Sequence, residues 1–124
     1  MTAPSSDDLI HLEQNYLAAR DSLGDITWTE EFPHYPEPVV HLMCYILGSV
    51  WTHRGYDIDK ATFVPPDEPT SLEEVRSTLT ALARSEQLAA GSWKQSLEAD
   101  RMRPLIKRAR RIILPKASQE FIVH

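Results

Sequence analysis

Residues 101–113 have the sequence RMRPLIKRARRII, in which apolar and basic residues recur at helical spacing. At 100° per residue, the apolar side chains fall within one arc of about 120°. These apolar residues are Met102, Leu105, Ile106, Ala109, Ile112 and Ile113. The basic residues fall on the opposite half of the helix and are Arg101, Arg103, Lys107, Arg108, Arg110 and Arg111. The segment therefore predicts an amphipathic helix with one packed face and one continuous basic surface.

The residues that flank this helix predict its ends. Asp100 is expected to cap the N-terminus, and Pro104 lies in the first turn, where a missing amide does little harm. Pro115 stops the helix, because proline cannot continue it. The tail at 115–124 either docks as an extended segment, with a short strand at 119–123, or frays.

An N-terminal helix is predicted from Ser5 or Ser6 to Gly24. The serine hydroxyls can cap the first amides, Asp7 and Asp8 favour the positive end of a helix, and glycine commonly ends one. Its apolar residues recur every three or four positions and are Leu9, Leu12, Tyr16, Ala19 and Leu23. They form a single stripe that faces the core.

A second helix is predicted to enter at Glu37-Pro38, since proline is tolerated at the first helical position, and to continue to Arg54 before Gly55. Its apolar residues cover a wide arc and are Val39, Val40, Leu42, Met43, Ile46, Leu47, Val50 and Trp51. A helix that is apolar over most of its circumference is normally buried. We therefore expect it to be the central helix of the core.

A third helix is predicted up to about Ser85, because Thr70 with Glu73 and Ser71 with Glu74 fit capping boxes. Its apolar residues follow one seam and are Leu72, Val75, Leu79 and Leu82. After Gly91, the pair Ser92 and Gln95 again fits a capping box, which predicts a short helix. This short helix should turn Trp93 and Leu97 inward.

Two proline-rich connections, 25–38 and 56–70, separate these helices and are expected to be loops. The 56–64 part could contain a turn or a strand. The first loop carries Trp28, Phe32 and Tyr35, which either cap the edge of the core or form a contact surface. The chain at 1–124 thus predicts an all-α fold, a compact single-domain bundle of about five helices with two Pro-rich loops.

Three stretches of the chain resemble one bacterial family. They are FPHYP at 32–36, which runs into the apolar helix, LTALARSE at 79–86 followed by Gly91, and PLIKRARRI at 104–112. In this order they resemble domain-of-unknown-function family 6508. The family pattern favours an aromatic residue where this chain has Gln87 and Leu88. The resemblance implies a compact helical domain and supplies no activity.

Charge is unevenly distributed along the 124 residues, whose net charge is −5. Residues 1–93 carry 5 Lys and Arg against 15 Asp and Glu, whereas residues 94–124 carry 8 against 3. The single cysteine, Cys44, excludes an intramolecular disulfide and fits a reducing compartment. The polar N-terminus lacks the pattern of a signal peptide, and the apolar stretch at 39–51 is too short to span a bilayer. We therefore expect a soluble, cytoplasmic protein that does not bind a membrane.

The sequence contains no pattern that predicts a catalytic, metal or cofactor site. The histidines are His11, His34, His41, His53 and His124, and they lack the spacing of metal ligands. His41 and His53 lie more than three turns apart on one predicted helix. Cys44 is expected to be a small buried hydrophobe rather than a nucleophile. Asp57 and Asp59 could suggest a magnesium site, but no glycine-rich phosphate loop accompanies them. Catalysis is not predicted.

Two functional hypotheses follow from the sequence. The first is a non-enzymatic protein-interaction module, such as an adaptor or a mobile-element-encoded inhibitor of a nucleic-acid-handling defence complex. It depends on the acidic first three-quarters and the aromatic residues at 28–35. The alternative is nucleic-acid binding through the basic face of the helix at 101–113. That face could instead be only solvated, or pair with the acidic N-terminal surface within the monomer or across a homodimer.

Overall fold

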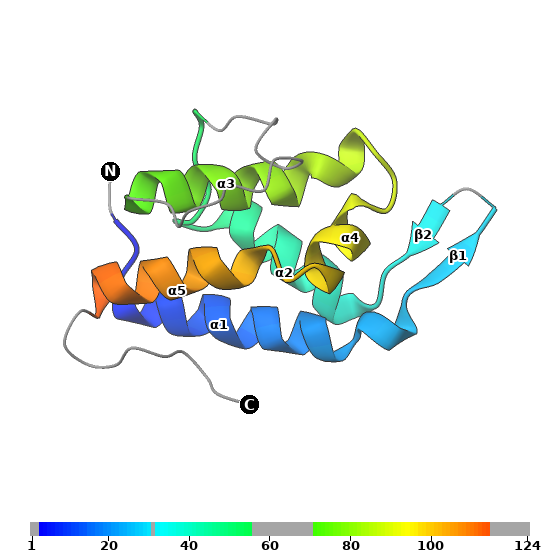
Figure 1. The fold of residues 1–124 in the computed structure, drawn as a ribbon, viewed down its shortest axis with the longest axis horizontal. Helices are drawn as coiled ribbons and strands as arrows, with labels where there is room; N and C mark the ends of the chain where they lie inside the picture. The colour runs from blue at the N-terminus through cyan, green and yellow to red at the C-terminus, as the bar shows by residue number, and fades with distance from the viewer. Residues whose placement is uncertain (1–2, 31, 56–70, 115–124) are drawn as a thin grey trace.

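The computed structural model describes residues 3–30, 32–55 and 71–114 and is mainly helical, with one small antiparallel sheet (Figure 1). The elements in chain order are α1 (Ser6–Asp21), η1 (Leu23–Asp25), β1 (Thr27–Thr29), β2 (Phe32–His34), α2 (Glu37–Gly48), α3 (Leu72–Arg84), η3 (Ser85–Gln87), α4 (Ser92–Glu98) and α5 (Met102–Ile113). The prediction of a mostly helical bundle is therefore confirmed, but the all-α prediction is wrong in one respect, because the chain also contains a two-stranded antiparallel sheet. No helix within the described ranges has the length and apolar character that a membrane span requires.

The four longer helices form a closed ring. Helix α1 packs on α2, α2 on α3, α3 on α5, and α5 returns to α1. Figure 1 shows α4 across one end of this bundle, and the β1–β2 hairpin projects beyond the same end. Fully buried side chains from every helix fill the interior, among them Leu12, Tyr16, Leu42, Ile46, Leu79, Leu97, Met102 and Ile106.

The predicted start of α1 is confirmed. The Ser5 hydroxyl accepts a hydrogen bond from the Asp8 amide at 3.3 Å, and the Asp8 carboxylate accepts one from the Ser5 amide at 2.8 Å. This reciprocal pair satisfies two amides that would otherwise lack partners at the helix end.

Helix α2 ends at Gly48, six residues before the predicted end at Arg54. Ser49 takes an extended conformation, and its hydroxyl accepts a hydrogen bond from the Trp51 amide at 3.2 Å. The Trp51 indole N–H donates to the Asp8 carbonyl oxygen at 3.2 Å and its ring is fully buried. Beyond Gly48 the chain is therefore held by a tertiary contact with α1 rather than by helical hydrogen bonds. His53 consequently does not lie on the same helix as His41.

Helix α3, rather than α2, is the most buried helix among the described residues. Four α2 side chains are buried, whereas α3 buries Val75, Arg76, Ser77, Leu79, Thr80, Ala81, Leu82 and Ala83. The small and hydroxyl-bearing residues allow close approach on several sides. The Thr80 hydroxyl donates to the Arg76 carbonyl oxygen and accepts from the His53 amide, so its burial leaves no polar atom unsatisfied. The predicted cap of α3 is also confirmed, because the Ser71 hydroxyl accepts a hydrogen bond from the Glu74 amide.

Two predicted caps are wrong. Gly91, not Ser92, occupies the N-cap of α4, and the Ser92 hydroxyl donates to the Ala89 carbonyl oxygen instead. Arg101 is the N-cap of α5, and no side chain caps it. Asp100 has a φ of 57°, and its carboxylate pairs with arginines.

The segment predicted as a loop at 25–38 contains the β-hairpin. Its register pairs Thr27 with His34, Trp28 with Pro33, and Thr29 with Phe32. Glu30 has a φ of 58°, the left-handed conformation that two-residue hairpin turns require. The prolines do not prevent a strand here, because proline is tolerated on an edge strand and both strands of a two-stranded sheet are edges.

The other proline-rich segment, 56–70, lies outside the described residues, as does the tail at 115–124. The alternatives of a turn or strand at 56–64 and of a strand at 119–123 stay predictions. The same holds for the capping role of Thr70.

Gly91 joins the hairpin to the bundle. Its φ is +93°, and a Cβ atom placed on it would lie 3.0 Å from two ring carbons of Trp28. The indole therefore rests directly on the Gly91 backbone, which no larger residue would allow without movement.

We predict that Gly91→Ala lowers the free energy of unfolding by about 1–2 kcal/mol, because alanine is strained at this φ and its methyl group displaces the Trp28 ring. Urea unfolding followed by circular dichroism measures the change. Gly24→Ala is the matched control, since a Cβ there meets no atom within 4 Å. An equal effect of the two substitutions would contradict the proposed contact.

Candidate functional site

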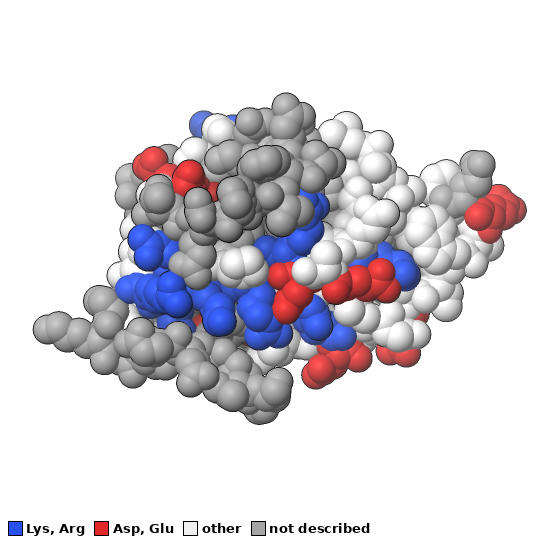
Figure 2. Space-filling view, viewed as in Figure 1, with Lys and Arg blue, Asp and Glu red and all other residues white. Residues whose placement is uncertain are grey.

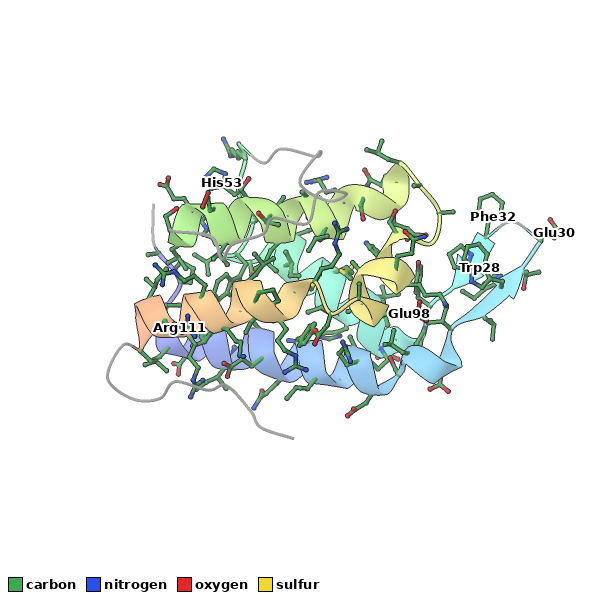
Figure 3. All side chains as sticks on the ribbon, in the orientation of Figure 1. Trp28, Glu30, Phe32, His53, Glu98 and Arg111 are labelled. Carbon is green, nitrogen blue, oxygen red and sulfur yellow. The ribbon has the colours of Figure 1, made fainter. Side chains whose placement is uncertain are left out.

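Large apolar side chains are exposed at the hairpin end of the molecule, with Trp28 and Phe32 on opposite faces of the two-stranded sheet. The exposed fractions are 49% for Trp28, 64% for Phe32 and 72% for Leu88. Trp28 and Phe32 lie on the two hairpin strands (Figure 3), and Leu88 lies in the loop whose Gly91 contacts Trp28. We call these three residues the hairpin surface. They form a candidate contact site, because such apolar groups gain free energy when a partner covers them.

Tyr35, which the sequence grouped with Trp28 and Phe32, lies instead against the body of the protein. Its hydroxyl donates to a Glu86 carboxylate oxygen at 2.7 Å, and its ring centroid lies 5.0 Å from that of Trp93. Burial and the neighbouring Glu86 carboxylate raise the pKa of Tyr35 above its ordinary value, so the hydroxyl keeps its proton. The aromatic group thus divides into a packed tyrosine and two exposed rings.

Glu86 holds the base of the hairpin and the start of α4 together. One carboxylate oxygen accepts hydrogen bonds from the Tyr35 hydroxyl and from the Trp93 amide at 3.0 Å, and the other accepts from the Gly91 amide at 2.7 Å. The carboxylate therefore does the work of an N-cap for α4. The sequence analysis missed this role, because a capping carboxylate five residues before the cap matches no local pattern.

The hairpin and the segments that flank it in the chain carry carboxylates. Residues 21–53 contain no Lys or Arg, and their acidic residues are Asp21, Asp25, Glu30, Glu31 and Glu37. Figure 2 shows an acidic side chain at the projecting tip, and most of the basic side chains in this view gather over the middle of the bundle. The hairpin end therefore combines exposed apolar rings with negative charge.

The basic residues of α5 form the band of positive charge in Figure 2. Arg111 is exposed, whereas the other five, Arg101, Arg103, Lys107, Arg108 and Arg110, are partly buried. Met102, Leu105, Ile106 and Ala109 are buried as predicted, but Ile112 is 37% exposed. The predicted apolar face is therefore buried over most of its length, and the predicted basic face is only partly exposed.

Arg110 forms an ion pair with a buried carboxylate. Its guanidinium donates to both Glu13 oxygens, at 3.0 and 2.9 Å, and Glu13 is 4% exposed. Burial raises the pKa of Glu13 above its ordinary value, and the hydrogen bond and charge of Arg110 oppose that rise. One member of the predicted basic face thus links α5 to α1 inside the monomer.

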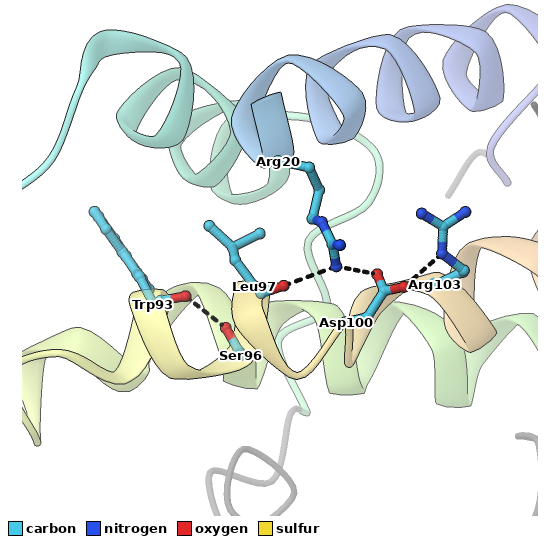
Figure 4. Close-up of polar contacts among 6 residues, drawn as sticks. All are labelled: Arg20, Trp93, Ser96, Leu97, Asp100 and Arg103. Atoms are coloured by element: carbon cyan, nitrogen blue, oxygen red, sulfur yellow. Dashed lines mark hydrogen bonds and ion pairs between the residues drawn. The ribbon is translucent and has the colours of Figure 1, made fainter. Parts of the chain in front are cut away.

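Arg103 is also paired within the chain. Its guanidinium contacts the Asp100 carboxylate, which also forms an ion pair with the Arg20 guanidinium at 2.9 Å (Figure 4). Arg20 donates as well to the Leu97 carbonyl oxygen at 2.9 Å, at the C-terminal end of α4. Asp100 therefore joins α1 to the α4–α5 junction, and part of the basic charge of α5 is neutralised.

The described residues offer little for other chemistry. Cys44 is exposed, so the prediction of a buried thiol is wrong. It lies on the outer face of α2, whose apolar arc is only partly covered. Within the described ranges, no three His, Cys, Asp or Glu residues come together as metal ligands.

Comparison with known proteins adds no relative. No family model matches the chain, no curated protein matches it, and no solved structure matches its fold. The resemblance to family 6508 stays a prediction.

We predict that Glu86→Ala lowers the free energy of unfolding by about 2–3 kcal/mol, because it leaves three donors without their acceptor. Tyr35→Phe should cost only about 1 kcal/mol, because Glu86 keeps its two backbone donors. Urea unfolding compares the two variants. Near-equal losses would show that the tyrosine hydroxyl, rather than the cap of α4, accounts for the effect.

We predict that Arg110→Met lowers the free energy of unfolding by about 3–5 kcal/mol at neutral pH, because Glu13 is left buried and unpaired. With its folded pKa raised further above the unfolded one, Glu13 binds a proton more tightly in the folded chain. The loss should therefore shrink as pH falls through the folded pKa. Urea unfolding across pH checks this. The Glu13→Leu/Arg110→Met double variant is the control, and it should show no such pH dependence.

Proposed function

We propose that this protein is a non-enzymatic protein-interaction module whose contact element is the hairpin surface. The observation that carries this proposal is the exposure of two aromatic rings, Trp28 and Phe32, on the hairpin that projects from the end of the helical bundle (Figure 3). Burial of such rings gives a large gain in free energy, and aromatic residues commonly dominate protein interfaces.

The mounting of the hairpin supports this role. Glu86 fixes its base through Tyr35, and Gly91 supports the Trp28 ring from below. A contact element that is already ordered loses little conformational entropy when it binds. The hairpin therefore has the properties of a preorganised binding element.

The carboxylates of the hairpin and its flanking segments favour a basic partner. An acidic end with exposed rings is complementary to a positively charged protein groove, such as those that hold nucleic acids. This is consistent with an adaptor and with an inhibitor of a nucleic-acid-handling defence complex. In both cases the module would act in the cytoplasm and without a cofactor.

Nucleic-acid binding by α5 is the second candidate. The positive band in Figure 2 favours it. The ion pairs of Arg103 and Arg110 weaken it, because a phosphate would have to compete with carboxylates that already lie within 3 Å of Arg110 and in contact with Arg103.

Photo-crosslinking in cells of the native host tests the proposal. We expect p-benzoylphenylalanine in place of Phe32 to form a covalent adduct with one protein, because the ring would lie in the interface. The same group in place of Gln14, which is exposed on α1, is the control and should form none.

p-Benzoylphenylalanine in place of Arg111 tests whether the basic face of α5 contacts a nucleic acid or a protein. A protein adduct at position 32 alone supports the hairpin surface. A nucleic-acid adduct at position 111, with none at 32, would refute it in favour of the second candidate. Equal adducts at 32 and 14 would also refute it, because they would indicate non-specific collision.

A further inference from the structure

The hairpin register determines which backbone groups point outward. Antiparallel pairs alternate between those that exchange two hydrogen bonds and those that exchange none. Pro33 has no amide hydrogen, so the pair Trp28–Pro33 is the non-bonded one. The N–H and C=O groups of Trp28 and the C=O group of Pro33 therefore point away from the partner strand.

The two outer edges of the hairpin are consequently different. On β2, the outward group is Pro33, which offers a carbonyl acceptor and no donor. On β1, the outward group is Trp28, which offers both a donor and an acceptor. All three residues of β1 are exposed. The edge of β1 can therefore accept another strand, whereas proline blunts the edge of β2.

Charge restricts what that strand can be. A second copy of this chain would bring its own hairpin, with Asp25 and Glu30 and no Lys or Arg within 21–53, against the same carboxylates. Like charges placed opposite one another in a sheet are destabilising. A segment with lysine or arginine side chains would instead meet Asp25 and Glu30 with opposite charge.

We propose that the edge of β1 binds an extended, lysine- or arginine-containing segment of a partner protein by strand addition centred on Trp28. This inference rests on the proposed function and specifies its binding mode. The backbone of Trp28 supplies one donor and one acceptor, as in other cases of strand addition. The acidic residues around the hairpin select the basic segment.

The side-chain alternation of β1 adds a specificity rule. Residues of the incoming strand that lie opposite Thr27 and Thr29 share a face with Phe32, because directly paired residues point to the same side. The residues of the incoming strand that lie between these positions share the other face of the sheet, which carries Trp28. The bound segment should therefore have an alternating pattern rather than the three- and four-residue spacing of a helix.

A displayed library of random 12-residue peptides tests the inference on the full chain. The Trp28→Ser/Phe32→Ser variant serves for counter-selection. We expect the enriched peptides to carry lysine or arginine, to lack a central proline and to contain apolar residues at alternate positions.

The strongest synthetic peptide is then measured for affinity and for protection of the Trp28 amide in hydrogen exchange. We expect the Trp28 amide to exchange more slowly when the peptide is bound. N-methylation of the central amide of the peptide should weaken its binding about tenfold. Asp25→Asn/Glu30→Gln should weaken binding at low salt. Glu73→Gln, an exposed change on α3, is the matched control and should leave it unchanged.

Four results would overturn strand addition. They are enrichment of acidic or helix-spaced peptides, binding without protection of Trp28, no enrichment over the double variant, and a dimer that protects Trp28 without peptide. A protein adduct at position 32 would leave the proposed function standing in each case. The absence of that adduct would remove the proposed function itself, so the two failures are distinguishable.

Discussion

The hydrogen bonds to the Glu86 carboxylate are the constraint on which the exposed end of this protein depends. A single side chain accepts from the Tyr35 hydroxyl and from the Gly91 and Trp93 amides. The first contact fixes the strand that leaves the hairpin, and the other two start α4. Because α4 and the hairpin share this anchor, a short helix and a two-stranded sheet become parts of one ordered surface. Neither is expected to be stable alone, since short helices and isolated hairpins are marginal in water.

Buried and half-buried ion pairs account for the distribution of charge. Glu13 and Arg110 join the first helix to the last, and Asp100 joins Arg20 to Arg103. These pairs draw the acidic N-terminal and the basic C-terminal parts of the sequence together inside one monomer. A pair of this kind costs desolvation, so its main effect is on which helices become neighbours rather than on net stability. Among the described residues, Figure 2 shows acidic charge at the hairpin tip and a basic band over α5.

Local sequence patterns predicted what local physics controls. Ser5 with Asp8 and Ser71 with Glu74 cap α1 and α3, because a hydroxyl three residues before an amide is already within reach. The apolar stripes of α1, α3 and α5 were predicted correctly over most of their lengths. Prediction failed where distant groups compete. The Trp51 indole donates to the Asp8 carbonyl oxygen, and Trp51 lies outside the α2 helix. Glu86, rather than Ser92, accepts from the first amides of α4. Asp100 pairs with arginines instead of capping α5.

The sequence by itself determined the helical class, the capped starts of two helices and the residues that the main core stripes bury, because these follow from periodicity and from contacts three or four residues apart. It also supplied Trp28, Phe32 and the basic residues of α5 as candidate contacts. Only the tertiary structure decided that Tyr35 is packed, that Arg110 is paired and that two rings stay exposed on a hairpin. The reason is physical. Each of these outcomes depends on a partner between 51 and 97 residues away, or on a strand register, which no local pattern specifies.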